Sequence, residues 1–171
     1  NALAAGAPIG ADKLTFLPFG NGVERILQNV PLGAHLLGLD LLKHDQQHIL
    51  RAAQEGIVSA LTYGFRIMKD MGMDLNTVKA GHANMFLSPI FRETFVQMNQ
   101  VNLELYDTDG AQGAARGAGI GAGVFASEEE AFHGLALLQT LAPDAAKADR
   151  YEEVYRTWLA RLEQLQKSTH N

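Results

Sequence analysis

The segment from Asp45 to Met71 constrains the fold more than any other part of the chain. Its apolar and small residues return every three or four positions from Ile49 to Met68, the spacing of an amphipathic helix packed on one side. Asp45 is suited to cap the first turn, and Gly72 is suited to end the helix. We therefore expect one long helix over 45–71.

Shorter predicted helices and strands flank this helix in the sequence. Strand-like patterns occupy 14–17, 77–80 and 103–106, and helical patterns occupy 88–99, 111–125, 127–138 and the stretch from Asp144 to the end, whereas 19–37 has the glycines and proline of a loop. Tyr151, Tyr155 and Trp158 form one stripe of the last helix and are expected in the core. The alternation of helix and strand predicts an α/β domain, rich in helices and with a small sheet.

Composition excludes several classes of protein. The 171 residues suit a single domain, and a net charge of −5 argues against nucleic-acid binding, which needs a basic face. The chain has no cysteine, so disulfides, thiolate zinc sites and cysteine nucleophiles are excluded. No stretch approaches the roughly 18 consecutive apolar residues of a membrane span, so no membrane partner is expected.

The run of glycine and alanine from Gly113 to Gly123 is the most unusual feature of the composition. Glycine inside a helix costs roughly 1 kcal/mol relative to alanine, so several of them need a reason. Gly113, Gly117 and Gly121 recur every four residues, and we expect this bare ridge to pack closely against a sheet or another helix. The alternative, a dinucleotide-binding loop, fits poorly because the glycines lie deep in the predicted helix.

Three histidines are candidates for binding a metal ion or a ligand. His44 and His48 lie four residues apart and could face one metal ion, but no acidic base lies between them, and we favour a solvated or capping pair at the helix start. His82 follows Gly81 between a predicted strand and a helix, where α/β sheets place ligands. It is either a ligand contact or a turn residue.

Two pairs of charged residues are also predicted to lie in loops. Glu24 and Arg25 could orient a polar ligand or form a weak surface ion pair. Asp107 and Asp109 could act as acid, base or metal ligands, although aspartate ahead of Gly110 is more often a turn former.

Four motifs then occur in order over about residues 10–125. They are residues 10–19 with 22–25, residues 34–39 followed by 48–56, residues 80–84 ahead of 87–92, and residues 109–118. Together they resemble the C-terminal domain of the FGGY family of carbohydrate kinases. Glu24-Arg25 and Ser88-Pro89 make the chain most similar to the xylulokinases of that family.

The resemblance implies an actin-like, ribonuclease-H-like domain that faces a second one across a cleft. Such kinases transfer the γ-phosphate of ATP, with Mg²⁺, to a hydroxyl of a small sugar, here most similar to a ketose such as xylulose. The glycine turn of their second domain contacts the nucleotide, and the matching residues are Gly81, His82, Ala83 and Asn84. Backbone amides at a helix start hold negative charge, and a turn without side chains lets a nucleotide come close.

The chain departs from the family pattern at a few points. His82 replaces a glycine, the loop ahead of Ser88 is longer, and Gln54 stands where an apolar residue is usual. The family's phosphate loop and the segment with its catalytic aspartate have no match, so we expect neither a catalytic residue nor a metal ligand here. These departures keep open an alternative, a non-catalytic nucleotide- or sugar-binding module with a kinase-derived fold.

The resemblance also predicts how the domains divide. Residues 10–171 are expected to form the C-terminal, nucleotide-side domain of a cytoplasmic kinase whose N-terminal domain is absent from this chain. Asn1-Ala2 resembles the scar of a cleaved purification tag, so residues 1–9 are expected to be such a scar or a flexible lead-in. Alone, the domain should be inactive, because phosphoryl transfer needs both walls of the cleft. A homodimer is compatible with the sequence.

Overall fold

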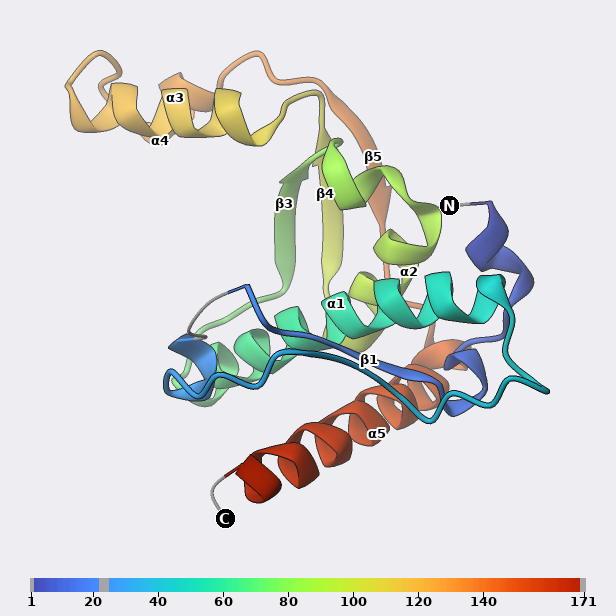
Figure 1. The fold of residues 1–171 in the computed structure, drawn as a ribbon. Helices are drawn as coiled ribbons and strands as arrows, with labels where there is room; N and C mark the ends of the chain where they lie inside the picture. The colour runs from blue at the N-terminus through green and yellow to red at the C-terminus, as the bar shows by residue number, and fades with distance from the viewer. Residues whose placement is uncertain (1, 22–24, 170–171) are drawn as a thin grey trace.

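The computed structural model describes residues 2–21 and 25–169, and Figure 1 shows its two parts. The lower part contains a two-stranded ribbon and the longest helices, and the upper part contains a three-stranded sheet from which a short helical arm projects. Among the described residues, no helix is both long enough and apolar enough to cross a bilayer.

Strand β1 (Thr15–Pro18) pairs in antiparallel fashion with β2 (Ala34–Leu37), with Thr15 opposite Leu37. The first strand was expected, but the loop predicted over 19–37 is wrong where it includes β2. It also contains the short helix η3 (Arg25–Leu27). Four residues carry too little alternation to mark a strand, and pairing with β1 decides their conformation.

Helix α1 (Gln46–Asp70) confirms the strongest expectation from the sequence. Asp45 caps it by accepting hydrogen bonds from the N–H groups of Gln47 and His48, and Gly72 follows its end at a φ of +88°. The helix crosses β1 closely, because a Cβ on Gly56 would lie 2.1 Å from the carbonyl oxygen of Phe16.

The second sheet has the order β3-β4-β5. Strands β3 (Thr77–Gly81) and β4 (Asn102–Tyr106) are parallel, and the crossover between them contains the short helix η4 (Asn84–Leu87) and α2 (Pro89–Asn99). Proline at the first position of α2 fits, because that N–H would have no helical partner. Strand β5 (Leu137–Leu141) pairs in antiparallel fashion with β4.

The helix predicted over 127–138 is wrong in its second half. Helix α4 (Glu128–Phe132) ends early, Gly134 adopts a φ of +78°, and β5 begins at Leu137. The leucines of this segment suit either structure locally, and the open edge of β4 selects the strand.

The glycine-rich helix α3 (Gly110–Gly121) has no buried residue. Beside Gly113, Gly117 and Gly121, nothing lies within 4 Å of where a Cβ would stand. The expected close packing is therefore wrong for this ridge within the described chain. Gly119 alone of the four has a near neighbour, the ring of Phe125.

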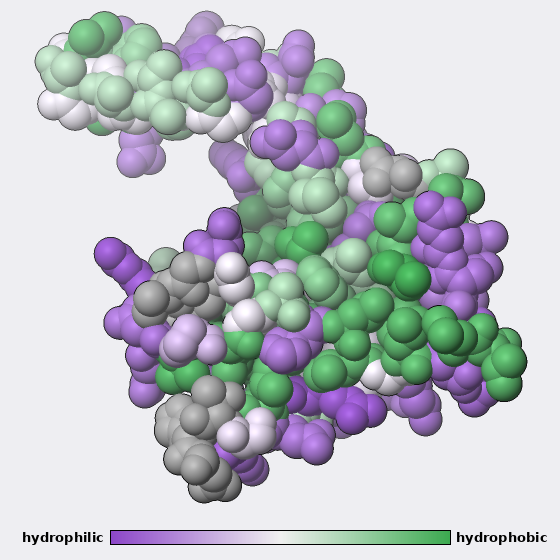
Figure 2. Space-filling model, in the orientation of Figure 1, coloured by the Kyte–Doolittle hydropathy of each residue, from purple (hydrophilic) through white to green (hydrophobic). Residues whose placement is uncertain are grey.

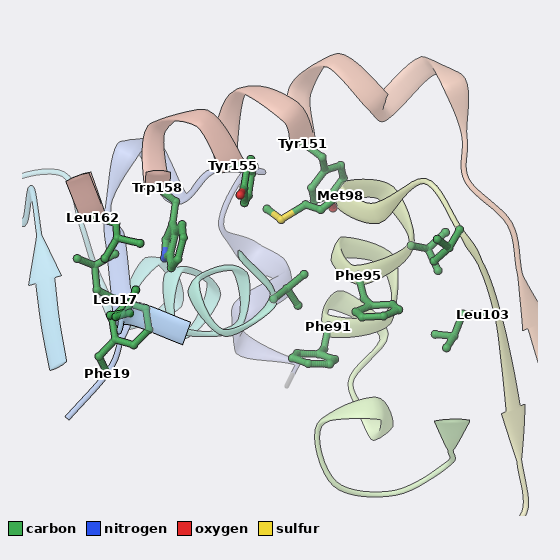
Figure 3. Packing of buried hydrophobic residues seen from close by; sticks show 14 of the residues in the cluster. Leu17, Phe19, Phe91, Phe95, Met98, Leu103, Tyr151, Tyr155, Trp158 and Leu162 are labelled. Carbon is green, nitrogen blue, oxygen red and sulfur yellow. The ribbon is translucent and has the colours of Figure 1, made fainter. Parts of the chain in front are cut away.

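Helix α5 (Ala145–Thr169) closes the lower part of the molecule. Tyr151, Tyr155, Trp158 and Leu162 are buried against β1, α1 and α2, as the stripe predicted, and Figure 3 shows them with Phe91, Phe95 and Met98. The Nε1 group of Trp158 donates a hydrogen bond of 3.0 Å to the carbonyl oxygen of Phe16.

Residues 3–9, which were expected to belong to a tag scar or a flexible lead-in, pack against the body. Leu3–Gly6 forms a short helix on α1, Ala4 and Ala7 are buried, and the carbonyl oxygen of Ala7 accepts a hydrogen bond from the buried guanidinium of Arg51. Residues 3–9 thus contribute to the core, and the boundary placed at residue 10 stays a prediction.

Candidate functional site

The carboxyl ends of β3 and β4 meet at one edge of the upper sheet, with Gly81 opposite Tyr106. The N–H of His82 donates to the carbonyl oxygen of Tyr106 at 2.8 Å, and the N–H of Thr108 donates to the same oxygen at 2.8 Å. The glycine turn and the loop that enters α3 therefore lie side by side. We call this set, residues 81–84 and 107–110, the strand-end shelf.

Contacts within the protein require glycine at position 81. A Cβ at this position would lie 2.4 Å from the carbonyl oxygen of Thr108 and 3.0 Å from its carbon, which is closer than real Cβ atoms approach. The space beside this glycine is filled by the neighbouring loop. Its lack of a side chain thus keeps the two loops together, where we expected room for a ligand.

The rest of the turn is open to solvent. His82 and Asn84 are exposed, and Ala83 is half-buried with extended backbone. Asn84 has a φ of +51°, a left-handed conformation that asparagine tolerates better than most residues, and it starts η4. The turn therefore presents two polar side chains outward.

Arg92 adds a cation beside this turn. Its Nη1 lies 3.4 Å from Nε2 of His82 and donates to Oε1 of Gln139 at 2.9 Å. Its Nε is buried and has no hydrogen-bond partner among the described residues. The guanidinium therefore has one buried donor without a partner, and its Nη1 is the group that lies beside the turn.

The first turn of α3 lies at the same edge. The carboxylate of Asp109 accepts a hydrogen bond from the N–H of Gln112 at 2.9 Å, which makes Asp109 the cap of this helix. The first N–H groups of a helix have no partner within it, so they are available to a ligand. Asp107 and Asp109 place two exposed carboxylates here as well.

Sequence reasoning missed Arg92 and Gln139 as members of this site. Arg92 is four positions after Ser88 in the expected helix, so its place beside the strand ends could have been inferred. Gln139 lies beyond the last residue of the helix predicted over 127–138, and its position on β5 depends on tertiary pairing. Glu24 lies outside the described residues, and its neighbour Arg25 is exposed.

His48 has the capping role that we favoured, whereas His44 is buried and does not cap the helix. Nδ1 of His44 accepts from the N–H of Asp40 at 2.9 Å, and the ring of His48 completes the cap of α1 with Asp45. Hydrogen bonds that its ring donates to the carboxylates of Asp45 and Asp12 raise the pKa of His48. Among the residues that the structure describes, no three histidine, aspartate or glutamate side chains gather as a metal site would require.

The strand-end shelf is exposed to solvent, and a more enclosed space lies elsewhere among the described residues. A cavity of 230 Å³ lies elsewhere, between the start of β1, α1 and α5, with Glu55 and Trp158 in its lining. An exposed shelf of polar groups is the form expected of one wall of a cleft.

No family model matches the chain. It is 29% identical to the xylulose kinase of Haemophilus influenzae over 96% of this chain and 34% of that protein. It is 31% identical to the xylulose kinase of Bacillus subtilis over 72% of this chain and 25% of that protein. The chain therefore spans about a third or less of these relatives.

Solved structures agree with the sequence relatives. The crystal structure of xylulose kinase from Rhodospirillum rubrum superposes with a TM-score of 0.77 over 99% of this chain and 34% of that one, at 26% identity. This likeness confirms the expected actin-like, ribonuclease-H-like fold with its many helices and small sheets.

Proposed function

The chain matches the C-terminal domain of the FGGY carbohydrate kinases, and from this premise we propose that it is the nucleotide-side domain of an ATP-dependent sugar kinase. The observation that carries the proposal is the position of the family's glycine turn. Gly81–Asn84 lies at the carboxyl ends of two parallel strands, the edge where α/β sheets bind ligands. The named relatives favour a ketose such as xylulose as the sugar.

The strand-end shelf offers complementary groups for a nucleotide. Arg92 and the first N–H groups of α3 would hold phosphate oxygens, and the exposed His82 and Asn84 stand beside them. Asp107 and Asp109 would oppose a free anion, but they suit a phosphate group that carries Mg²⁺, a cation that prefers oxygen ligands. These residues therefore fit ATP with its magnesium ion better than a bare phosphate.

Catalysis requires a second domain on the other side of the cleft. Phosphoryl transfer depends on positioning the nucleophile, the metal and the phosphates together, and the shelf is open to solvent. In this proposal an N-terminal kinase domain supplies the sugar site and the catalytic base, and the 171 residues alone are inactive.

The nucleotide site can be tested on the chain itself. With ADP and Mg²⁺ at millimolar concentration, we expect the amide resonances of residues 81–84 and 107–111 to shift more than those of α5. Arg92→Ala should weaken these shifts, whereas Arg156→Ala, which removes an exposed arginine of α5, should preserve them. Equal shifts in the shelf and in α5, or shifts unaffected by Arg92→Ala, would contradict the assignment.

The kinase activity needs the natural gene product. ADP release would be measured with ATP and Mg²⁺ against ketoses, aldonates and polyols. Stimulation by a ketose would support the proposed activity and identify its substrate class. Absence of turnover with every compound, combined with retained ADP binding, would favour the alternative of a non-catalytic nucleotide-binding module.

A further inference from the structure

The cavity between the start of β1, α1 and α5 contains a buried carboxylate. Glu55 lines this cavity and is 3% exposed. Its Oε1 accepts a hydrogen bond of 3.0 Å from the N–H of Gly10 and one of 2.8 Å from Nε of Arg51. No group of the described residues donates a hydrogen bond to its Oε2. Buried polar atoms normally have a partner, so Oε2 is available to a donor from a molecule in the cavity.

Arg51 forms an ion pair with Glu55 but does not itself line the cavity. Its guanidinium also donates hydrogen bonds to the carbonyl oxygen of Ala7 and to the hydroxyl of Tyr151, which fixes its position. Burial still raises the pKa of Glu55, because the ionised carboxylate lacks solvation that a further donor would supply. A hydroxyl group in the cavity would be such a donor.

The rest of the lining combines hydroxyl groups with aromatic surface. Thr15, Ser59 and Thr157 carry the hydroxyl groups, and Phe16 and Trp158 provide the aromatic rings. Figure 1 shows β1 between the two long helices, and Figure 2 shows polar and apolar side chains side by side over this lower part of the molecule. Such a lining suits a ligand that has both carbon-bound hydrogens and hydroxyl groups.

The charges around the cavity disfavour an ionic ligand. Its lining includes four exposed charged residues, two cations and two anions, which are Lys13, Arg150, Asp12 and Glu153. A carboxylate or phosphate group inside would face the carboxylate of Glu55, and an ammonium group would compete with Arg51 for it. A neutral molecule therefore fits better than an ion of either sign.

The volume of the cavity limits the size of its ligand. An engineered protein cavity of about 150 Å³ holds benzene, which has six non-hydrogen atoms. By the same ratio, the 230 Å³ of this cavity holds about nine such atoms. This is roughly the size of a polyol of four or five carbon atoms.

We propose that this cavity is a binding site for a small neutral polyol of four or five carbon atoms. One hydroxyl group of the polyol donates to Oε2 of Glu55, and its carbon chain lies against the ring of Trp158. The lining includes no residue of the strand-end shelf, so the inference does not depend on the proposed nucleotide site.

Binding can be measured on the 171-residue chain with erythritol and xylitol as probes. The chain has a single tryptophan, so the indole N–H of Trp158 gives one resolved resonance at the cavity. This resonance and the amide of Gly10 should shift saturably, with half-saturation at or below about 20 mM, whereas the amides of α3 should not. Absence of a saturable shift with both polyols would show that the cavity holds only water and would overturn the proposal.

Xylonate tests the class of ligand. It has the carbon chain of xylitol with a carboxylate at one end, and that carboxylate would lie in the same cavity as the one of Glu55. Xylonate should therefore bind at least tenfold more weakly than xylitol. Equal or tighter binding of xylonate would contradict the assignment to neutral polyols.

Substitutions at Thr157 test the location. This residue is half-buried on α5, so a larger apolar side chain can occupy the cavity there while the pair of Glu55 and Arg51 stays intact. Thr157→Phe should weaken xylitol binding at least tenfold, and Thr157→Leu, a smaller change that is easier to accommodate, should weaken it less. Ala160→Phe places the same ring at an exposed position of α5 and should leave binding unchanged. Undiminished binding in both Thr157 variants would place the polyol elsewhere and refute the site.

Discussion

Gln54 shows how a single side chain can depart from a family pattern for a structural reason. It is 6% exposed within α1, where a polar group needs a hydrogen-bond partner. Its Oε1 accepts a hydrogen bond of 2.6 Å from the hydroxyl of Ser88, which is itself 1% exposed at the start of α2. The pair therefore joins α1 to the segment that supports the glycine turn, so Gln54 has a structural role in this chain.

This pair predicts strong coupling between two substitutions. Ser88→Ala leaves the amide of Gln54 without its partner and should reduce the free energy of unfolding by about 1–3 kcal/mol. Gln54→Leu combined with Ser88→Ala should recover part of that loss, because no buried polar group then remains unpaired. Urea denaturation of both single variants and the double variant measures the coupling. Additive effects would show that the hydrogen bond contributes nothing specific.

The start of α1 depends on charge as well as on hydrogen bonds. Nδ1 of His48 lies 2.7 Å from the carboxylate of Asp45, and its Nε2 lies 3.3 Å from that of Asp12. Hydrogen bonding to His48 lowers the pKa of Asp45, and hydrogen bonding to Asp45 raises the pKa of His48. The helix start is therefore most stable when His48 is protonated and Asp45 is ionised.

The sign of the pH dependence follows from these shifts. Because folding raises the pKa of His48 above 6.5, its contribution is fully present below that pH and is lost as the pH rises through the raised value. Because folding lowers the pKa of Asp45, its contribution is present above 3.8 and is lost as the pH falls through the lowered value. The pair contributes most between these limits.

His48→Gln should separate the charge of this pair from its capping role. Glutamine at the third helical position can still bond to the cap residue, so the variant should match the wild type at pH 8.5 and be less stable at pH 5.5. Denaturant midpoints at both pH values measure the difference. His133→Gln, at an exposed histidine on the arm side of the molecule, is the control. A loss of the same size at both pH values would contradict the charge argument.

The lower part of the molecule is held together by α5. Its aromatic side chains fill the space between β1 and α1, where Trp158 lies 6.1 Å from Phe19 and 6.4 Å from Tyr63 between ring centroids. The hydrogen bond from Trp158 to Phe16 also satisfies a carbonyl group of β1. The two ends of the described chain thus share one core.

Trp158→Ala should accordingly destabilise the whole domain. Loss of a fully buried tryptophan creates a cavity, and we expect the free energy of unfolding to fall by about 3–5 kcal/mol. Far-UV circular dichroism is the appropriate probe, because the chain has a single tryptophan and the variant loses its fluorescence. Arg156→Ala, whose side chain is 76% exposed, should change stability by less than about 1 kcal/mol. A small effect of Trp158→Ala would show that α5 is not essential to the core.

The sequence alone predicted the elements that local patterns specify. Helices α1, α2 and α5 were expected almost to the residue, because their apolar spacing, caps and prolines act within a few positions of one another. Strands β3 and β4 were expected as well, and with them the place of Gly81–Asn84 at a strand end. Whether that turn binds a nucleotide stays a prediction.

Only the tertiary structure decided the remaining features. The strands β2 and β5 form because a distant strand pairs with them, and Gly81 is needed because the loop at Thr108 approaches it. The glycine face of α3 was expected to be packed, yet within the described chain it faces open space. These outcomes depend on contacts between segments far apart in the chain, and no local pattern of side chains records them.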